Sequence, residues 1–262
     1  HACDFFNLFL LAWVGIQDRA APVEAWGPGP AGGLRALPPH PLGHDEPPAA
    51  CGSNPTPGLL EMTEAQIQAH AYDINVRIRE AGRTDLRGLF ATHEIAIPQD
   101  IGGRPPNDVS PPMEPIVITE DDAVRVSAVL VHHPPVFPAF AYRFDTDDGA
   151  VVVSGDTAPS PNLVRLAEGA DILVHEVLDA DFMTAQSGTS WRSQAMLNHL
   201  LCAHTPLEKV GSVAGQAGVR RLVLSHFIPS IEGIPDERWA KGAAAGFDGE
   251  VVVGHDLMEL HL

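Results

Sequence analysis

Short apolar runs separated by turn residues dominate the second half of the chain. Their β-branched character predicts four strands, at residues 115–119, 124–131, 141–145 and 150–154. The residues Asp147-Asp148-Gly149 predict a hairpin between the last two runs. Beyond them, helices are expected at 162–168, before Cys202 and at 207–217, strands at 172–175 and 222–225, and a closing hairpin from 250–253 and 257–262. Strands covered by helices predict a layered α/β sandwich.

The first hundred residues combine apolar segments with proline-rich stretches. Residues 63–81 have the period of an amphipathic helix, with a capping box that begins at Thr63 and Gly82 as its stop. The prolines predict loops, and we interpret about 28–115 as a Pro-rich insertion. The other expected elements are a buried helix at 3–19 and short strands at 23–26, 86–90 and 94–97. The apolar stretch Phe5–Ile16 is too short to span a bilayer, so we expect no membrane association.

The length, hydrophobic content and net charge of the chain limit the possible domain count and binding partners. The chain has 262 residues, of which 45% are hydrophobic, enough for one α/β domain with a sizeable core. Its formal net charge is −18. An acidic surface repels phosphate backbones, because nucleic-acid binding depends largely on Lys and Arg. We therefore do not expect a nucleic acid as partner.

The three cysteines, Cys3, Cys51 and Cys202, form no CxxC or CxxxC pair. A structural zinc site built from thiolates is therefore not expected. The interpretation as small, buried apolar residues fits all three. A disulfide such as Cys3 with Cys51 is left open.

Candidate metal ligands follow several predicted strands. His133, Asp156, His175 and His226 each lie at or just beyond the carboxyl end of an apolar run. In α/β sheets this edge is where ligand sites are built. Imidazole and carboxylate groups suit Zn²⁺, Mn²⁺ or Fe²⁺, and an aspartate such as Asp156 can bridge two ions about 3.5–4 Å apart. The pattern predicts a metal site at this edge.

Three motifs that follow one another along the chain resemble those of one known family. They are Ser154-Gly155-Asp156-Thr157, Asp171-Ile172-Leu173-Val174-His175-Glu176 and Leu222-Val223-Leu224-Ser225-His226-Phe227, preceded by Val131-His132-His133-Pro134-Pro135. Together they resemble the ribonuclease Z and arylsulfatase-like branch of the metallo-β-lactamase superfamily, over roughly residues 124–228. The resemblance implies the metallo-β-lactamase αββα sandwich as a single domain over residues 1–262.

The resemblance also implies roles for individual residues. His133, rather than His132, is expected to bind the first metal ion, Asp156 to bridge both ions, and His226 to bind the second. Two zinc ions are the expected cofactor, with manganese or iron as alternatives. His204 matches the family's general acid and Glu176 the carboxylate that orients it. His175 is expected to be structural.

The family's HxHxDH signature is absent upstream of these motifs. The chain opens His1-Ala2-Cys3-Asp4-Phe5, and in the family that signature leads into an apolar helix. We interpret His1 as the last histidine of the signature and a fourth metal ligand, with the N-terminal part of the domain missing. A tag remnant or an ordinary terminal residue is the alternative. On this interpretation the chain alone is not expected to be active, and its localisation, cytoplasmic or secreted, stays open.

The expected function is hydrolysis of a small ester. Residues 133–143 are most similar to the arylsulfatase-like subgroup, which implies a small-molecule ester substrate, arylsulfatase-like or phosphodiester, attacked by a metal-bound hydroxide. One alternative is a ribonuclease Z that processes tRNA 3′ ends. The short hairpin between Arg143 and Ser154 disfavours it, since the bacterial enzymes resembled here carry a tRNA-gripping arm in that interval. A non-catalytic metallo-β-lactamase-fold module, a lactonase or β-lactamase, and a homodimer are also left open.

Overall fold

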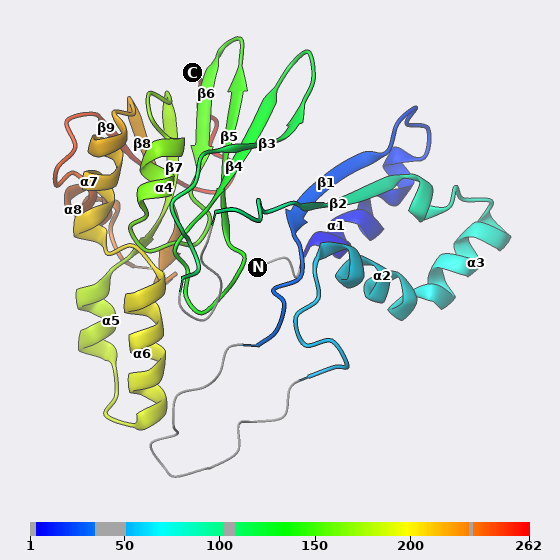
Figure 1. The fold of residues 1–262 in the computed structure, drawn as a ribbon, viewed down its shortest axis with the longest axis horizontal. Coiled ribbons are helices and arrows are strands. Elements are labelled where there is room, and N and C mark those ends of the chain that lie inside the picture. Colours follow the sequence, from blue (N-terminus) through cyan, green and yellow to red (C-terminus); the bar gives the residue numbers. More distant parts are fainter. Residues whose placement is uncertain (1–3, 35–50, 102–107, 231–232) are drawn as a thin grey trace. The chain divides into compact units, whose positions relative to one another are not determined.

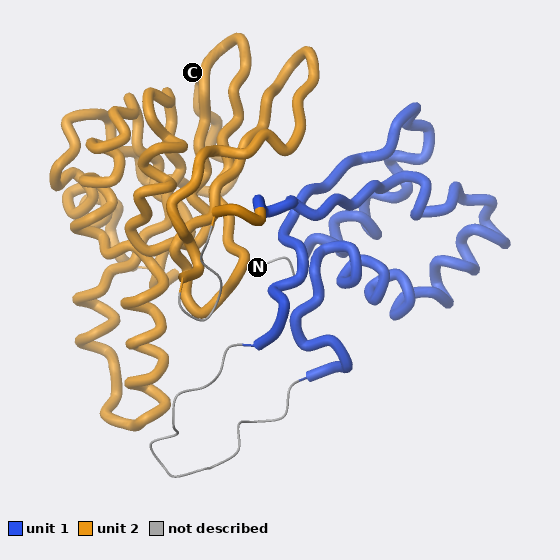
Figure 2. Tube along the Cα trace, viewed as in Figure 1, with its two compact units in different colours: residues 1–98 blue, residues 99–262 orange. Residues whose placement is uncertain are grey.

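The computed structural model describes residues 4–34, 51–101, 108–230 and 233–262. It divides into two compact units, residues 1–98 and residues 99–262 (Figure 2). His1 and Cys3 lie outside the described residues, so the interpretation of His1 as a fourth metal ligand stays a prediction. The prediction of one domain with an insertion at about 28–115 stays a prediction.

The described residues of the first unit form two parallel strands and three α-helices. Strand β1 (Val23–Pro28) lies beside β2 (Phe90–Ile95). The helices are α1 (Phe5–Ala12), α2 (Leu59–Ala69) and α3 (Ala71–Ala81). Short 3-10 turns cover Trp13–Ile16 and Leu86–Gly88. One buried hydrophobic cluster of this unit contains Phe6, Trp13, Ile74, Leu86 and Leu89.

The helix predicted at 63–81 is two helices. The first begins after Gly58, and the backbone breaks at His70. The predicted capping box is wrong, because the Thr63 hydroxyl donates to the Leu59 carbonyl one turn back, at 2.8 Å, inside α2. The predicted stop is confirmed, since Gly82 ends α3 in the left-handed conformation with φ of +62°.

The second unit is built on one seven-stranded sheet. Its strands, in spatial as well as chain order, are β3 (Ile116–Glu120), β4 (Arg125–Leu130), β5 (Phe140–Thr146), β6 (Gly149–Val153), β7 (Ile172–Leu178), β8 (Arg221–Ile228) and β9 (Glu250–Val253). Strands β3 to β6 are antiparallel, and β6 to β9 are parallel. The carboxyl ends of β4, β6, β7 and β8 therefore meet at one edge of the sheet.

Helices accompany this sheet in two groups (Figure 1). Helices α4 (Pro161–Leu166), α7 (Leu207–Ala217) and α8 (Asp236–Ala243) pack against its strands. Helices α5 (Ala180–Gln186) and α6 (Trp191–Ala203) form a hairpin that extends from the end of β7. The expected α/β architecture is confirmed, although α5 and α8 are absent from the sequence prediction.

The predicted closing hairpin is wrong. Strand β9 lies parallel to β8, and residues 257–262 form no strand. The amide of Gly254 donates to the Leu224 carbonyl at 3.0 Å, which extends the parallel ladder past β9. Gly254 therefore ends a parallel strand instead of turning a hairpin. In the part of the chain that the structure describes, no helix has both the length and the apolar character needed to cross a membrane.

Candidate active site

The polar residues predicted at the strand ends do come together at one edge of the second unit. His133 follows β4, Asp156 follows β6, and Glu176 and His226 lie near the ends of β7 and β8. Because these four strands point the same way, their carboxyl ends converge. This edge forms the candidate active site.

His133 is held in one tautomer by the end of α6. Its Nδ1 atom donates to the Ala203 carbonyl at 2.9 Å, which leaves Nε2 with its lone pair. The side chain is buried, and this burial lowers the pKa of His133, so the neutral form that binds metal is favoured. His132 lies apart from the cluster, with Nδ1 hydrogen-bonded to the Ser110 hydroxyl at 3.2 Å.

Asp156 occupies a tight turn after β6. Gly155 before it has a left-handed backbone, with φ of +60°. A Cβ atom at position 155 would lie 2.5 Å from the Phe140 carbonyl oxygen, so only glycine fits there. The turn directs the carboxylate toward β8, where Asp156 Oδ1 lies 3.6 Å from His226 Nε2.

His226 is the extra residue of a bulge between β7 and β8. Glu176 pairs with Ser225 and Val177 with Phe227, so His226 has no opposite residue. Its φ of +44° is left-handed, which is rare for a residue other than glycine. Bulges and such backbone conformations occur next to active sites, where they redirect a side chain. The bulge leaves His226 about half exposed and facing Asp156.

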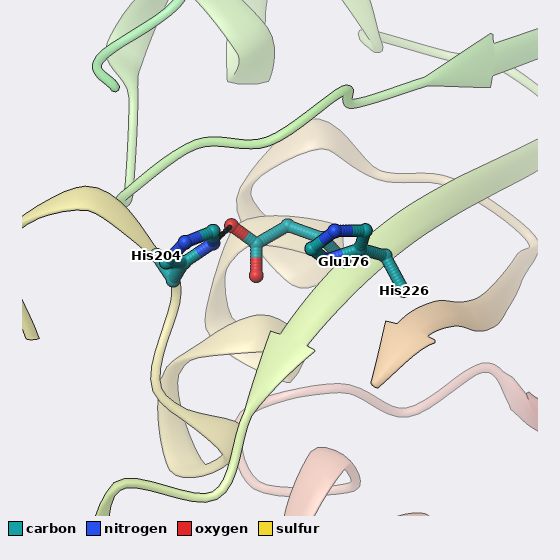
Figure 3. Close-up of side chains that lie close together, drawn as sticks. All are labelled: Glu176, His204 and His226. Atoms are coloured by element: carbon teal, nitrogen blue, oxygen red, sulfur yellow. Dashed lines mark hydrogen bonds and ion pairs between the residues drawn. The ribbon is translucent and has the colours of Figure 1, made fainter. Parts of the chain in front are cut away.

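Glu176 and His204 form a buried pair (Figure 3). Glu176 Oε1 accepts hydrogen bonds from His204 Nδ1 at 2.9 Å and from the Thr157 amide at 2.8 Å. A second hydrogen bond holds the segment after Asp156 against the segment after His204. The Thr205 hydroxyl donates to the Thr157 carbonyl at 2.6 Å. Burial raises the pKa of Glu176 above its ordinary value, although the bonds from His204 and Thr157 act in the opposite direction.

The donor set fits a divalent metal ion. Glu176, His204 and His226 each offer a ligand atom, and these atoms lie within 4.8 Å of one another (Figure 3). Glu176 Oε2 is buried and has no hydrogen-bond partner among the described residues, so it is a carboxylate oxygen that a cation would satisfy. The His204 ring stacks on His226 with centroids 5.8 Å apart, and His133 lies 5.0 Å from His204. The residues of this edge can hold a divalent metal ion, which the chain uses as cofactor.

Two further histidines, His175 and His199, adjoin the site residues in sequence or in space. His175 neighbours Glu176 on β7 and therefore points to the opposite face of the sheet. It is fully buried, which lowers its pKa to about 4. His199, in contrast, lies close to His133 and His204 and is absent from the sequence prediction. The signal that could have identified it is its place near the end of a helix that leads into His204.

No protein-family model matches the chain, but individual relatives do. A ribonuclease Z of Mycobacterium tuberculosis (strain ATCC 25618 / H37Rv) is 31% identical over 212 residues, which cover 78% of this chain and 67% of the relative. A second M. tuberculosis sequence, from strain CDC 1551 / Oshkosh and also described as a ribonuclease Z, is 31% identical and is covered to 82%.

Solved structures agree on the fold. Human tRNase Z, short form, matches with a TM-score of 0.53 at 17% identity, over 97% of this chain and 73% of that one. The metallo-β-lactamase-fold protein YhfI of Bacillus subtilis matches with a TM-score of 0.52 at 14% identity, over 97% and 70%. At these identities the likeness establishes the metallo-β-lactamase fold.

The relatives overturn two predictions. Hydrolysis of a small-molecule ester is wrong as the main function, and so is the exclusion of a nucleic-acid partner, because the matching sequences are ribonucleases. The physical reason is that a net charge of −18 describes the whole chain, whereas phosphate is bound by local charges and metal ions. The chain belongs to the ribonuclease Z family of metal-dependent hydrolases with the metallo-β-lactamase fold.

Proposed function

We propose that this protein is a ribonuclease Z-type endonuclease that hydrolyses a phosphodiester bond of precursor tRNA near its 3′ end. One observation carries the proposal: the Asp156–His226 pair lies beside the buried His204–Glu176 pair. Metal-competent and proton-transferring groups are thus adjacent, as hydrolysis of a phosphodiester requires.

In this proposal His133, Asp156 and His226 would hold the zinc ions, two in number. Bound zinc would supply positive charge for the phosphate undergoing displacement and would lower the pKa of a water molecule. The Ala203 carbonyl orients the His133 ring through Nδ1 and leaves Nε2 as the ligand atom. Manganese or iron could occupy the same donor set.

His204 serves as the general acid. Its Nδ1 atom is committed to Glu176, so a proton held on Nε2 is the one available for transfer. Protonated His204 would hand this proton to the departing 3′ oxygen of the RNA. The Glu176 carboxylate stabilises the charged ring before the transfer and holds it in place, as in other carboxylate–imidazole pairs. Glu176 is itself positioned by the Thr157 amide.

Cleavage of a precursor tRNA tests the proposal. The full-length protein is incubated with zinc and a tRNA transcript that carries a 3′ extension, and the products are mapped. We expect one cut near the end of the mature tRNA sequence, and no cut with Asp156→Asn. Asp148→Asn, in the exposed β5–β6 turn, is the matched control and should cut normally. Turnover of p-nitrophenyl sulfate with intact tRNA would overturn the proposal.

A further inference from the structure

His199 lies at the third corner of a triangle of imidazole rings. It belongs to α6, one turn before the end of that helix, and is half-buried. Its ring centroid lies 6.1 Å from that of His133 and 6.2 Å from that of His204, while those two are 5.0 Å apart. The His199 ring therefore lies close to both a proposed metal ligand and the proposed general acid.

The helix fixes this position. His199 and Ala203 are four residues apart, so they lie on the same face of α6. The Ala203 backbone carbonyl accepts the hydrogen bond from His133, so the carboxyl end of α6 lies against the cluster. The start of the helix is also fixed, because the Ser190 hydroxyl caps it by accepting from the Ser193 amide at 3.1 Å.

His199 lies outside the group of residues whose possible metal-ligand atoms lie closest together. Ligand atoms on one zinc ion lie within about 4.2 Å of one another, since zinc–nitrogen bonds are about 2.0–2.1 Å long. Among the described residues, the ligand atoms found within 4.8 Å of one another belong to Glu176, His204 and His226. His199 is outside this group, as are the proposed ligands His133 and Asp156, so the zinc content of a His199 variant decides whether His199 binds metal. Its ring nitrogens also make no hydrogen bond to any residue that the structure describes, whereas His133 and His204 each use Nδ1.

A free imidazole N–H in this position suits an anionic oxygen. The neighbouring carboxylates, Asp156 and Glu176, would repel a phosphodiester, and a hydrogen-bond donor beside the cluster would offset that repulsion. We propose that His199 is a further substrate-contacting residue, whose ring N–H donates a hydrogen bond to a non-bridging oxygen of the scissile phosphodiester. The inference rests on the proposed function only in that it requires a phosphodiester substrate.

Two substrates and three variants test it. Precursor tRNA and bis(p-nitrophenyl) phosphate are assayed with His199→Leu, His199→Gln and the neighbouring exposed control Asn198→Leu. We expect His199→Leu to lower kcat/KM about 10²-fold on every phosphodiester that the wild type cleaves, as loss of one aligned donor does elsewhere. His199→Gln, which keeps an N–H donor, should recover most of this loss, and Asn198→Leu should match the wild type.

The outcomes separate this inference from the proposed function. If the wild type cleaves only bis(p-nitrophenyl) phosphate, the tRNA proposal fails while the His199 effect is still decided on that substrate. Equal kcat/KM for His199→Leu and wild type would overturn the inference. So would equal losses in the Leu and Gln variants, which indicate a packing role. Loss of zinc from His199→Leu, measured by elemental analysis, would identify His199 as a ligand and also overturn it.

Discussion

The Nδ1 atom of His133 donates a hydrogen bond to the backbone carbonyl of Ala203, 2.9 Å away. A carbonyl oxygen only accepts, so the proton is on Nδ1 and the Nε2 lone pair is available. The last carbonyls of a helix carry partial negative charge, which strengthens such a bond. Ala203 ends α6, and His204 follows directly. One helix terminus thus orients the proposed metal ligand and positions the proposed acid.

Substitution of His133 should lower metal affinity, whereas substitution of the adjacent His132 should leave it unchanged. His133→Ala removes a proposed ligand, so we expect metal affinity to fall by more than about 100-fold, since losing a ligand's hydrogen-bond partner alone costs 10–100-fold. His132→Ala removes only the contact with Ser110 and should keep the wild-type metal content. Zinc titration followed by elemental analysis measures both. The reverse ranking would mean that His132 is the ligand.

The buried pair should separate catalysis from metal binding. His204→Ala removes the proposed proton donor, so kcat should fall by about 10²–10⁴-fold. Glu176→Gln keeps the shape of the side chain but removes the charge that stabilises protonated His204, and should give a smaller loss in kcat. Zinc content should stay at the wild-type level in His204→Ala. If zinc is lost there, His204 acts as a ligand, as its proximity to His226 also allows.

The sequence predicts those parts of the site that strand patterns reveal. His133, Asp156 and His226 follow apolar β-branched runs, and the structure brings their strand ends to one edge. Neither the positive φ of His226 nor the bulge has a sequence signal, because both arise from the pairing of β7 with β8. Their assignment as metal ligands remains a prediction.

Helices could be predicted from the sequence only where buried apolar residues recur with helical spacing. Helix α7 appears with its predicted bounds, since buried Val210, Val213, Ala214 and Ala217 recur with helical spacing. Helix α5 has no buried residue, so apolar periodicity could not indicate it. The pairing of His204 with Glu176 is predicted only by the family resemblance. No sequence pattern predicts that His199, on α6, lies close to the site.

Two glycines with similar backbones should respond differently to alanine. Gly169 has φ of +65° and open space around its Cα, so Gly169→Ala should cost about 1–2 kcal/mol from backbone strain alone. Gly155 has φ of +60°, but an added Cβ would lie 2.5 Å from the Phe140 carbonyl oxygen. Gly155→Ala should therefore cost more than Gly169→Ala and also weaken metal binding through Asp156. Denaturant unfolding and zinc titration test this, and equal costs would contradict the close approach.

Acid should remove a stabilising contact at the start of α5. The buried Asp179 carboxylate accepts from Arg238 Nε at 2.5 Å and from the Phe182 amide at 3.0 Å. Burial alone would raise its pKa, but these bonds outweigh burial and hold the pKa of Asp179 below its ordinary value. The folded state thus binds a proton less readily than the unfolded state. The stabilisation is fully present above the unfolded pKa of about 3.9 and is lost as the pH falls through the folded pKa.

Asp179→Asn isolates this contribution. At pH 7 we expect it to lower the free energy of unfolding by about 1–3 kcal/mol, because hydrogen bonds to a charged group are lost. The difference from wild type should begin to shrink as the pH falls below about 3.9, where the unfolded wild-type chain takes up the proton, and should be lost as the pH falls through the lower folded pKa. The exposed control Asp148→Asn should change the unfolding free energy by less than about 0.5 kcal/mol. Urea unfolding at pH 3, 4, 5 and 7 measures both variants, and a pH-independent Asp179→Asn effect would contradict the lowered pKa.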